Sequence, residues 1–480
     1  MSATAAILTT LVVYKIALLA IGLLANRRTK DDTDFVLGGR TMGPLVAAIS
    51  ASASSSSVWT LLGVSGYAYA FGFSAFWLFP ACVGGFALNW FVIAPRLQRH
   101  SRATDALTLS EVLAGPRGTP GRELVLRVAT GMILLAMVVY VAAQLRGSGL
   151  LFDDVFRDFG AARPAPATTI LIGAGIIVVY TLLGGFWAVS LTDTLQGLMM
   201  ALTAIALPVA AVAEVGGLPR LFDEILTTQD DTYQSFTAHL APTAAIGMVA
   251  GLLGIGLGYP GQPHVVNRFM ALRDERSVAR ARTYAMVWAV VVYLGMILLG
   301  LAGRILVPEI VNEERVFFRL TNDLFPVFIS GIMIAAVLSA IMSTADSQLL
   351  VAATSISHDL AKDQRGNVGR SRVTVLLVSV GATLFAIYGT KEIFRNVLSA
   401  WTAMGAAFGP LLVVTLWRGR PSTTACLATM ITGFGTATLT HWLVVHEPTI
   451  AGQQFRWISR VVPYAAAGLV AIATARKRTR

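Results

Sequence analysis

The chain has 480 residues, of which 55% are hydrophobic and 13% are charged, whereas soluble domains carry about 25% charged residues. This composition, with a mean hydropathy of +0.68, excludes an ordinary soluble protein and indicates an integral membrane protein. The formal net charge of +11 would suggest nucleic-acid binding if it formed one patch, but its distribution along the chain is that of a topology signal.

Apolar segments long enough to cross about 30 Å of hydrocarbon as a helix recur along the whole chain. The alternation typical of barrel strands is absent, so the sequence predicts an all-α polytopic membrane protein with about thirteen transmembrane helices. The predicted spans are residues 5–25, 42–67, 70–95, 124–150, 167–184, 189–214, 243–265, 280–303, 326–357, 371–389, 393–417, 422–445 and 456–475.

The first apolar segment is not a signal peptide, because its basic residues follow the apolar part instead of preceding it. These residues are Arg27, Arg28 and Lys30. We therefore expect 5–25 to remain as a helix. Lys15 lies inside this helix and is interpreted as a packed or snorkelling side chain.

The positive charge is concentrated on alternate loops. The loops 26–40, 96–127, 266–282, 358–372, 418–420 and 476–480 hold 25 Lys and Arg, and the opposite set holds ten. Because positively charged loops stay cytoplasmic, the N-terminus is predicted outside and the C-terminus inside. The two cysteines, Cys82 and Cys426, have neither metal-ligand nor redox spacing and are predicted core residues.

A run of six serines lies within residues 49–63, in a segment that is otherwise apolar. Serine has a low helix propensity, and its hydroxyl can bond to the backbone in place of the helical ladder. The helix can therefore open at mid-depth, and the freed carbonyls can hold a cation, provided that protein or a water-filled cavity surrounds them. The alternative is that small residues only permit close helix packing.

A second interruption is predicted at 251–264, where five glycines and two prolines fall within fourteen residues, since both residue types weaken or break helices. Gly256 to Gly261 formally match G-x-G-x-x-G. No strand precedes the match and Pro260 interrupts the expected helix, so we reject a dinucleotide site.

Ala340, Ser343 and Thr344 share one face of the predicted helix 326–357, because they lie at positions i, i+3 and i+4. Two hydroxyls and a carbonyl on one face form a hard-oxygen site suited to Na⁺. Asp346 lies nearby, and an ionisable residue at this depth is a functional hypothesis by default. Solvation near the cytoplasmic mouth is the alternative for this carboxylate.

The two interrupted helices are about 200 residues apart and run in opposite directions in the predicted topology, which indicates an inverted repeat. The chain is predicted to be a single transporter domain over 1–480. The first repeat would cover 42–214 and the inverted second repeat 243–417. The N-terminal helix 5–25 and the two C-terminal helices in 422–475 would lie outside the repeats.

Several motifs in register resemble the solute:sodium symporter family, and within it bacterial sodium/proline symporters. They are FVLGGRTMG (35–43), the serine run through WTLLG (59–63), GGFWAVSLTDTLQ (184–196), GLGYPGQPH (256–264), AIMSTADSQLL (340–350) and SAWTAMGAAFGP (399–410).

The resemblance implies a LeuT-type five-plus-five inverted repeat with a sodium site between the opened second helix and the ninth helix. The implied Na⁺ ligands are Ala53, Ser56, Ala340, Ser343 and Thr344. The residues implied around the substrate are Ser57, Trp59, Tyr140, Ile255, Gly258 and Tyr259. Arg40 and Asp193 would act on the cytoplasmic side in coupling and ion release.

The sequence departs from the family pattern at two positions. The proline carriers have an aspartate where this chain has Ser55 and a tryptophan where it has Ile255. We hypothesise that Asp346 replaces the lost carboxylate from across the cavity. Without the tryptophan, the pocket is expected to be wider or to select a different side chain.

These observations predict Na⁺-coupled symport of a small zwitterionic amino acid, with proline as the first candidate, by alternating access. Na⁺ is the co-transported ion, and the other partners are the substrate and the lipid bilayer. A proton-coupled carrier of the same fold and a transporter-like nutrient sensor are the alternatives. No H-E-x-x-H or other metal-spaced cluster occurs, so a membrane enzyme is not expected.

Overall fold

The computed structural model describes residues 3–26, 36–156, 164–183, 186–361, 368–389, 392–446 and 457–475. Within these ranges every regular element is helical, and β-type pairing is limited to one bridge between Met42 and Leu272. The predicted all-α class is confirmed. The positive clusters at 27–30 and 476–480, which contribute to the topology prediction, lie outside the described residues.

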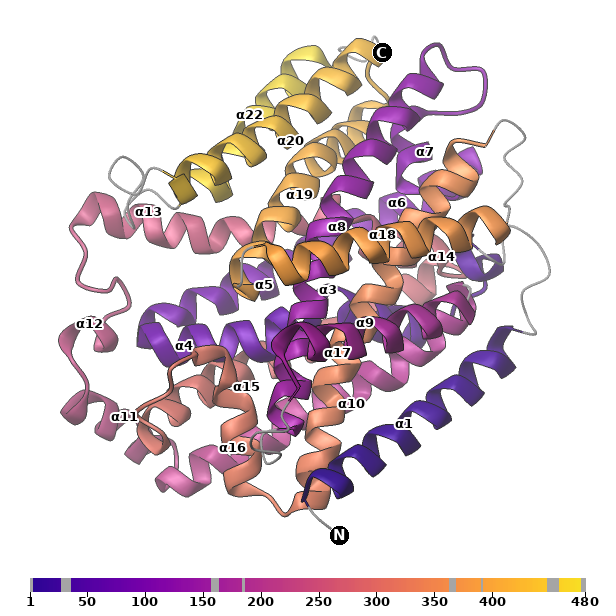
Figure 1. The fold of residues 1–480 in the computed structure, drawn as a ribbon. Helices are drawn as coiled ribbons and strands as arrows, with labels where there is room; N and C mark the ends of the chain where they lie inside the picture. Colours follow the sequence, from indigo (N-terminus) through magenta and orange to yellow (C-terminus); the bar gives the residue numbers. More distant parts are fainter. Residues whose placement is uncertain are drawn as a thin grey trace.

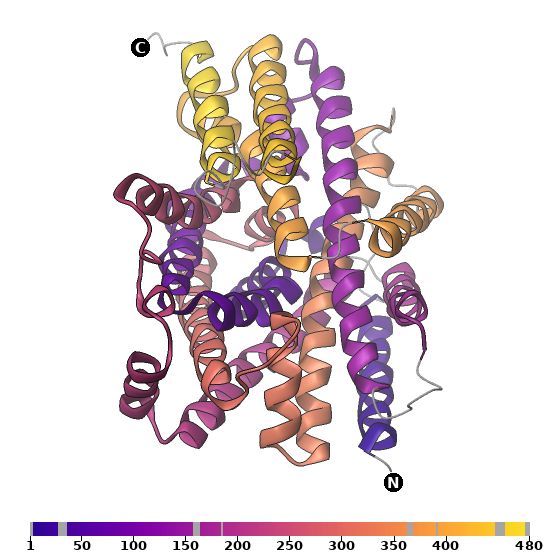
Figure 2. The ribbon, with the colours of Figure 1, turned by 60° about the vertical axis from the view of Figure 1, so that its left-hand side comes forward.

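The chain crosses the molecule repeatedly, and the start of α1 and the end of α22 lie at opposite ends (Figures 1 and 2). They are α1 (Ala3–Asn26), α3 (Pro44–Val58), α4 (Ser65–Phe71), α5 (Leu78–Ala87), α6 (Ala94–Thr104), α7 (Leu109–Ala114), α8 (Arg122–Val155), α9 (Pro166–Leu183), α10 (Phe186–Val215), α11 (Leu218–Thr228), α12 (Asp231–Gln234), α13 (Pro242–Leu253), α14 (Pro263–Ala271), α15 (Glu275–Leu306), α16 (Val316–Leu324), α17 (Val327–Thr354), α18 (Val368–Tyr388), α19 (Ile393–Arg418), α20 (Thr423–His446) and α22 (Ile458–Thr474).

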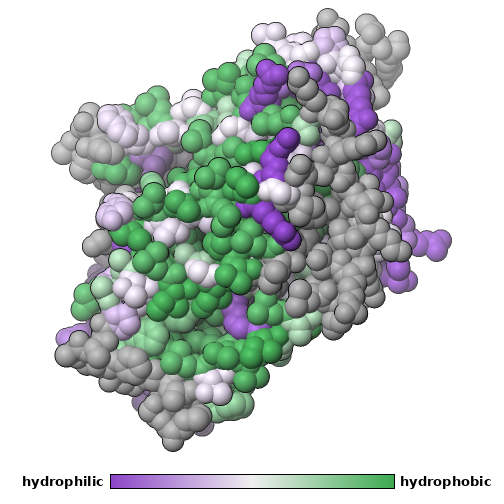
Figure 3. Space-filling view, turned by 45° about the vertical axis from the view of Figure 1, so that its right-hand side comes forward, coloured by the Kyte–Doolittle hydropathy of each residue, from purple (hydrophilic) through white to green (hydrophobic). Residues whose placement is uncertain are grey.

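The outer surface of the described chain is apolar over a wide area, as Figure 3 shows for one face. Large hydrophobic side chains such as Leu135, Leu202, Phe328 and Leu377 are each 65 to 68% exposed. A soluble monomer rarely exposes contiguous apolar surface on this scale. The surface is that of a protein whose solvent is lipid.

Eight helical stretches of the described residues are long and apolar enough to cross a membrane, and three shorter apolar helices accompany them. The multi-pass prediction is confirmed, and the number of thirteen crossings stays a prediction. One of the eight stretches, Pro44–Thr104, has 61 residues and would measure about 90 Å as one straight helix. It is interrupted at Gly72, so it comprises the two predicted spans 42–67 and 70–95.

Gly72 is the residue that permits this interruption. It ends α4 with a φ of 58°, a conformation that L-residues with a Cβ rarely adopt. A Cβ at this position would also lie 2.1 Å from the carbonyl oxygen of Tyr233.

The core is organised around α17. Helix α3 contacts α10, α15 and α17, and α10 in turn contacts α15 and α17. Every residue of α17 from Met333 to Thr354 is buried. The face that carries Ala340, Ser343 and Thr344 is therefore enclosed by protein and not by lipid, as an ion site at this depth requires.

Close packing of α10 against α15 depends on Gly295, because a Cβ there would lie 2.1 Å from the backbone carbonyl oxygen of Ala204. Backbone cannot move aside without separating the helices, so Gly295→Ala is expected to lower the free energy of unfolding by about 1 to 3 kcal/mol. Thermal unfolding of the purified protein measures this. The matched control is Gly131→Ala in α8, where a Cβ meets nothing within 4 Å. Equal stability of the two variants would contradict the packing described here.

Candidate ion and substrate site

The serine run opens α3, as predicted. Ser57 has φ 44° and ψ −178°, outside the helical region, and every residue from Ala47 to Val58 is buried. Two side chains bond to the backbone amides freed by the break. The Ser57 hydroxyl oxygen accepts the Trp59 N–H at 3.1 Å, and Oε1 of Gln144 accepts the Val58 N–H at 3.2 Å. A non-glycine residue at positive φ costs about 1 to 3 kcal/mol and persists only where its surroundings hold it.

The second predicted interruption is also present. Helix α13 ends at Leu253, a 3₁₀ segment covers Gly254–Gly261, and Gln262 is extended before α14 begins at Pro263. Helix α19 bonds to the exposed backbone. The Trp401 indole N–H donates to the Ile255 carbonyl at 3.0 Å, and the Gln262 amide donates to the carbonyls of Gly258 and Trp401 at 3.1 and 2.9 Å.

The opened part of α3 faces α17 through oxygen atoms. The Ala53 carbonyl lies 3.4 Å from the hydroxyls of both Ser343 and Thr344. The Ala340 carbonyl lies 3.3 Å from the Ser343 hydroxyl. We call these four residues the oxygen cage. The Ser56 carbonyl, the fifth predicted ligand, accepts the Trp59 N–H, and its role as a ligand stays a prediction.

The spacing of the oxygen cage suits a cation with oxygen ligands. When six oxygens surround a hard cation as an octahedron, each at about 2.4 Å from the ion, neighbouring oxygens are about 3.4 Å apart. Among the described residues, no cluster of three or more His, Cys, Asp or Glu could hold a metal. The cage consists of carbonyl and hydroxyl oxygens, which are neutral hard ligands, and such ligands favour Na⁺ over a transition metal.

Aromatic side chains from both interrupted helices converge beside the break. The ring centroids of Tyr259 and Trp401 are 4.7 Å apart, and those of Tyr140 and Trp401 are 6.5 Å apart. Trp59 lies 6.4 Å from Tyr293, whose hydroxyl is 3.0 Å from that of Tyr259. The structure thus brings together Ser57, Trp59, Tyr140 and Tyr259. Gly258 packs against α19, since a Cβ there would lie 2.1 Å from the Trp401 indole nitrogen.

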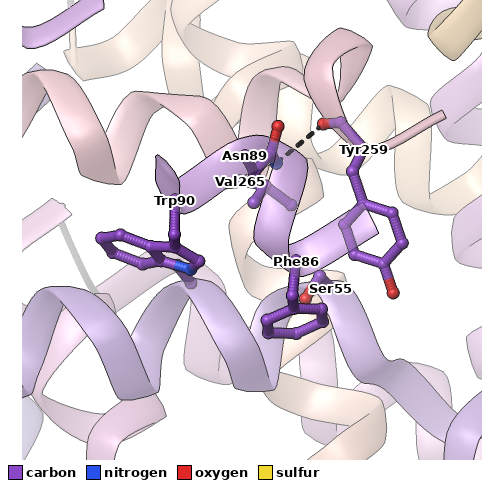
Figure 4. Close-up of a pocket in the computed structure, with 7 residues that line it drawn as sticks. Ser55, Phe86, Asn89, Trp90, Tyr259 and Val265 are labelled. Atoms are coloured by element: carbon purple, nitrogen blue, oxygen red, sulfur yellow. Dashed lines mark hydrogen bonds between the residues drawn. The ribbon is translucent and has the colours of Figure 1, made fainter. Parts of the chain in front are cut away.

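A small pocket opens beside Tyr259 (Figure 4). Phe86, Asn89, Trp90 and Val265 line it together with Ala51 and Ser55 of α3. The Asn89 amide donates to the Tyr259 carbonyl at 3.1 Å. Ser55 thus lies at the pocket wall. Asn89, Gln144 and Trp401 were not predicted as site residues, because single amides and aromatics in apolar helices carry no local signal.

Asp193 is joined to Arg268 in a fully buried ion pair, with Oδ2 3.0 Å from the guanidinium. The same oxygen accepts hydrogen bonds from Ser50 at 2.9 Å and Ser347 at 3.2 Å. The pair therefore links α3, α10, α14 and α17. Arg268 corrects the sequence prediction, which counted it among the residues of a charged loop; it is buried because Asp193 balances its charge.

The other three predicted coupling residues, Arg40, Ser55 and Asp346, have hydrogen-bond partners other than this pair. Arg40 forms an ion pair with Asp105 at 3.2 Å and donates to the Ala106 carbonyl at 3.0 Å. Asp346 accepts a hydrogen bond from Thr181 of α9. Ser55 donates to the Ser52 carbonyl within α3 at 3.0 Å, and no hydrogen bond among the described residues joins Ser55 to Asp346.

A three-residue turn, Glu313–Arg315, lies over the start of α19. Glu314 accepts the Phe394 N–H at 3.3 Å, and the Phe394 ring lies 5.6 Å from that of Trp59. On its other side the turn packs on α4, since a Cβ at Gly66 would lie 3.0 Å from the Glu313 backbone. The turn thus lies beside the segment that begins at Trp59.

The model of the sodium:solute symporter family matches residues 35–433. The chain is 35% identical over 434 residues to the high-affinity proline transporter PutP of Bacillus subtilis (strain 168), covering 87% of this chain and 89% of that protein. It is 34% identical over 452 residues to the sodium/proline symporter of Escherichia coli (strain K12), covering 90% of this chain and 87% of that protein. A solved structure of a Na⁺-coupled sialic acid symporter superposes with a TM-score of 0.77 at 18% identity, covering 98% of this chain and 97% of that one.

The fold is that of a polytopic membrane protein with the LeuT-type architecture, as predicted. Its sequence assigns it further: the chain belongs to the sodium:solute symporter family. It is therefore a transporter and not an enzyme, and sodium is the coupling ion of its family.

Removing one partner of the Asp193–Arg268 pair leaves the other charge buried without compensation. We expect Arg268→Met to lower the free energy of unfolding by about 3 to 5 kcal/mol, and the double variant Asp193→Asn/Arg268→Met to regain most of the loss. The control is Arg99→Met, whose pair with Glu275 is exposed and contributes less than about 1 kcal/mol. Thermal unfolding measures all three variants. Additive losses in the double variant would contradict the pairing.

The turn over α19 should loosen as the pH rises. Burial, aided by the charges of Glu313 and Glu392 and opposed by the Phe394 hydrogen bond, raises the pKa of Glu314 from 4.5 to about 7. Between these values the folded state binds one more proton than the unfolded state, so stability falls with rising pH by at most about 1.4 kcal/mol per unit. Unfolding temperatures between pH 5 and 8 measure the effect. Glu314→Gln should remove this part of the pH dependence; an unchanged profile would refute it.

Proposed function

We propose that this protein couples the entry of Na⁺ to the uptake of proline or a similar small zwitterionic amino acid, in a bacterial inner membrane. The observation that carries the proposal is the oxygen cage, because it joins the opened α3 to α17 directly beside the break at Ser57. The curated relatives named as proline transporters support the choice of substrate.

Several buried polar atoms near the interruptions have no hydrogen-bond partner among the described residues, and four of them support a zwitterionic substrate. The free donors are Trp59 Nε1 and Gln144 Nε2, and the free acceptors are Asn89 Oδ1 and Gln262 Oε1. Each amide orientation is fixed by a backbone bond made by its other atom. Two donors suit a carboxylate and two acceptors suit a secondary ammonium. Buried polar atoms normally find partners, so a bound ligand explains them.

Hydroxyl groups allow the oxygen cage to respond to an ion. Ser343 and Thr344 donate to the Ala53 carbonyl, but each hydroxyl also carries lone pairs and can turn them toward a cation. Na⁺ would replace these hydrogen bonds by ion contacts that hold α3 to α17. Because α3 also carries Ser57 and borders Trp59, the ion orders the substrate site. By linkage, the substrate raises the Na⁺ affinity by the same factor.

The available energy is sufficient for uphill uptake. One charge moving inward across about 100 mV releases about 2.3 kcal/mol, and a tenfold Na⁺ gradient adds about 1.4 kcal/mol. Together these support a substrate gradient of several hundredfold. Asp193 and Arg40 are proposed to act in coupling and ion release on the cytoplasmic side.

The proposed architecture places two inverted repeats at 42–214 and 243–417, with 5–25 and 422–475 outside them. The interruptions at Ser57 and Gln262 occupy corresponding positions about 200 residues apart, which supports this division. The positive charge of alternate loops supports an external N-terminus and a cytoplasmic C-terminus.

Thr344→Val removes one oxygen from the cage while keeping the shape of the side chain. We expect the half-saturating Na⁺ concentration for proline uptake to rise at least about tenfold, since one lost ligand costs a bound charge more than about 1.4 kcal/mol. The control is Thr354→Val on the same helix, whose hydroxyl bonds only to the Leu350 carbonyl; it should behave as the wild type.

Uptake into proteoliposomes under an imposed Na⁺ gradient or an imposed pH gradient tests the function itself. Na⁺-driven accumulation is expected. Accumulation driven only by the pH gradient would indicate the proton-coupled carrier, and proline binding without net flux would indicate the nutrient sensor.

A further inference from the structure

Helix α1 lies against the ion-site helices. It contacts α10 and α17 and runs beside α10 in Figure 1. Its residues Ile7, Leu11 and Leu18 are buried. The Tyr14 hydroxyl lies 2.5 Å from that of Ser339 on α17. A helix outside the proposed repeats is thus fixed to the helix that carries the oxygen cage.

Lys15 brings a positive charge into this contact. Its side chain is half-buried, and its ammonium group contacts Met342 of α17. Asp346 lies one helical turn beyond Met342 on α17, the helix against which α1 packs. An ammonium on a lipid-facing helix is costly unless it pairs with a charge in the protein interior.

Asp346 needs such a partner. It is fully buried, and only its Oδ1 accepts a hydrogen bond, from Thr181. Its Oδ2 has no hydrogen-bond partner. The cation of the core, Arg268, is already paired with Asp193. Lys15, which reaches α17 one turn away at Met342, is the cation of the α1–α17 contact.

Asp346 is also close to the cage in sequence and on the helix surface. It follows Thr344 by two residues and lies one turn from Ser343. An unbalanced carboxylate at this position would attract Na⁺ to the cage and hold it there, because charges interact strongly where water is excluded.

We propose that Lys15 is the counter-charge of Asp346, and that α1 is thereby part of the ion-coupling machinery. Lys15 acts as a positioning residue: it balances Asp346, so that the cage binds Na⁺ through neutral oxygens and can release it. The inference rests on the proposed function, because it assigns the cage to Na⁺.

The two single substitutions have opposite consequences for Na⁺. Lys15→Met leaves Asp346 unbalanced and should lower the half-saturating Na⁺ concentration by about tenfold or more, with slower uptake at saturation. Asp346→Asn leaves the ammonium unbalanced and should raise that concentration by a similar factor. The double variant Lys15→Met/Asp346→Asn should return to within about threefold of the wild type. Structural damage cannot produce shifts of opposite sign that cancel in the double variant.

The experiment titrates the full-length purified protein with NaCl at constant ionic strength, and measures thermal stabilisation by Na⁺ and Na⁺-driven proline uptake. Lys15→Arg keeps the charge and is the matched control, with wild-type Na⁺ dependence expected. Shifts of the same sign in both single variants would overturn the inference, as would wild-type Na⁺ dependence in both or a double variant that departs from the wild type by about tenfold or more. If Lys15→Met does not fold, a tenfold change in the double variant, with Lys15→Arg unchanged, also overturns it.

The wild type separates this inference from the proposed function. Without Na⁺-dependent stabilisation or Na⁺-driven uptake in the wild type, the proposed function fails and this inference with it. If the wild type shows both and the substitutions behave otherwise than stated, only the role of Lys15 fails.

Discussion

The structure depends on one constraint: in hydrocarbon, every backbone polar group needs a partner within the protein. Two helices are interrupted in the core, and side chains of other helices bond to backbone groups that the interruptions expose. Gln144 accepts the Val58 N–H, and the Trp401 indole donates to the Ile255 carbonyl. The Ala53 and Ala340 carbonyls differ, because their side-chain partners are hydroxyls that can turn their lone pairs to an ion. The constraint that shapes the fold thus leaves a cage for one cation.

The same constraint applies to charges. Asp193 and Arg268 balance each other in the core, and both bond to Ser50, so the pair ties the charge balance to the opened helix. The proposed pair of Lys15 and Asp346 provides a second balance, between α1 and α17. With both acids paired, the binding of Na⁺ to the cage changes the net charge of the site. Na⁺ binding is therefore sensitive to the membrane potential and to the Na⁺ gradient.

The sequence predicts features that depend on local composition. Serines 50–57 and the Gly and Pro residues of 251–264 predict the two interruptions, because low helix propensity acts within a few residues. Helical periodicity predicts that Ala340, Ser343 and Thr344 share a face. Pairings between distant segments have no such signal. Arg268 and Asp193 are 75 residues apart, and Asp346 is bonded to Thr181 of α9, away from the pocket that Ser55 lines.

The most direct test of the account is a high-resolution map of the protein with saturating Na⁺ and proline, compared with one in choline. The account predicts density in the Na⁺ map at about 2.3 to 2.6 Å from the oxygens of Ala53, Ala340, Ser343 and Thr344, absent in choline, with α3 broken at Ser57 in both. A continuous α3 through Ser57, or an ion bound elsewhere while these oxygens bond only to one another, would contradict it.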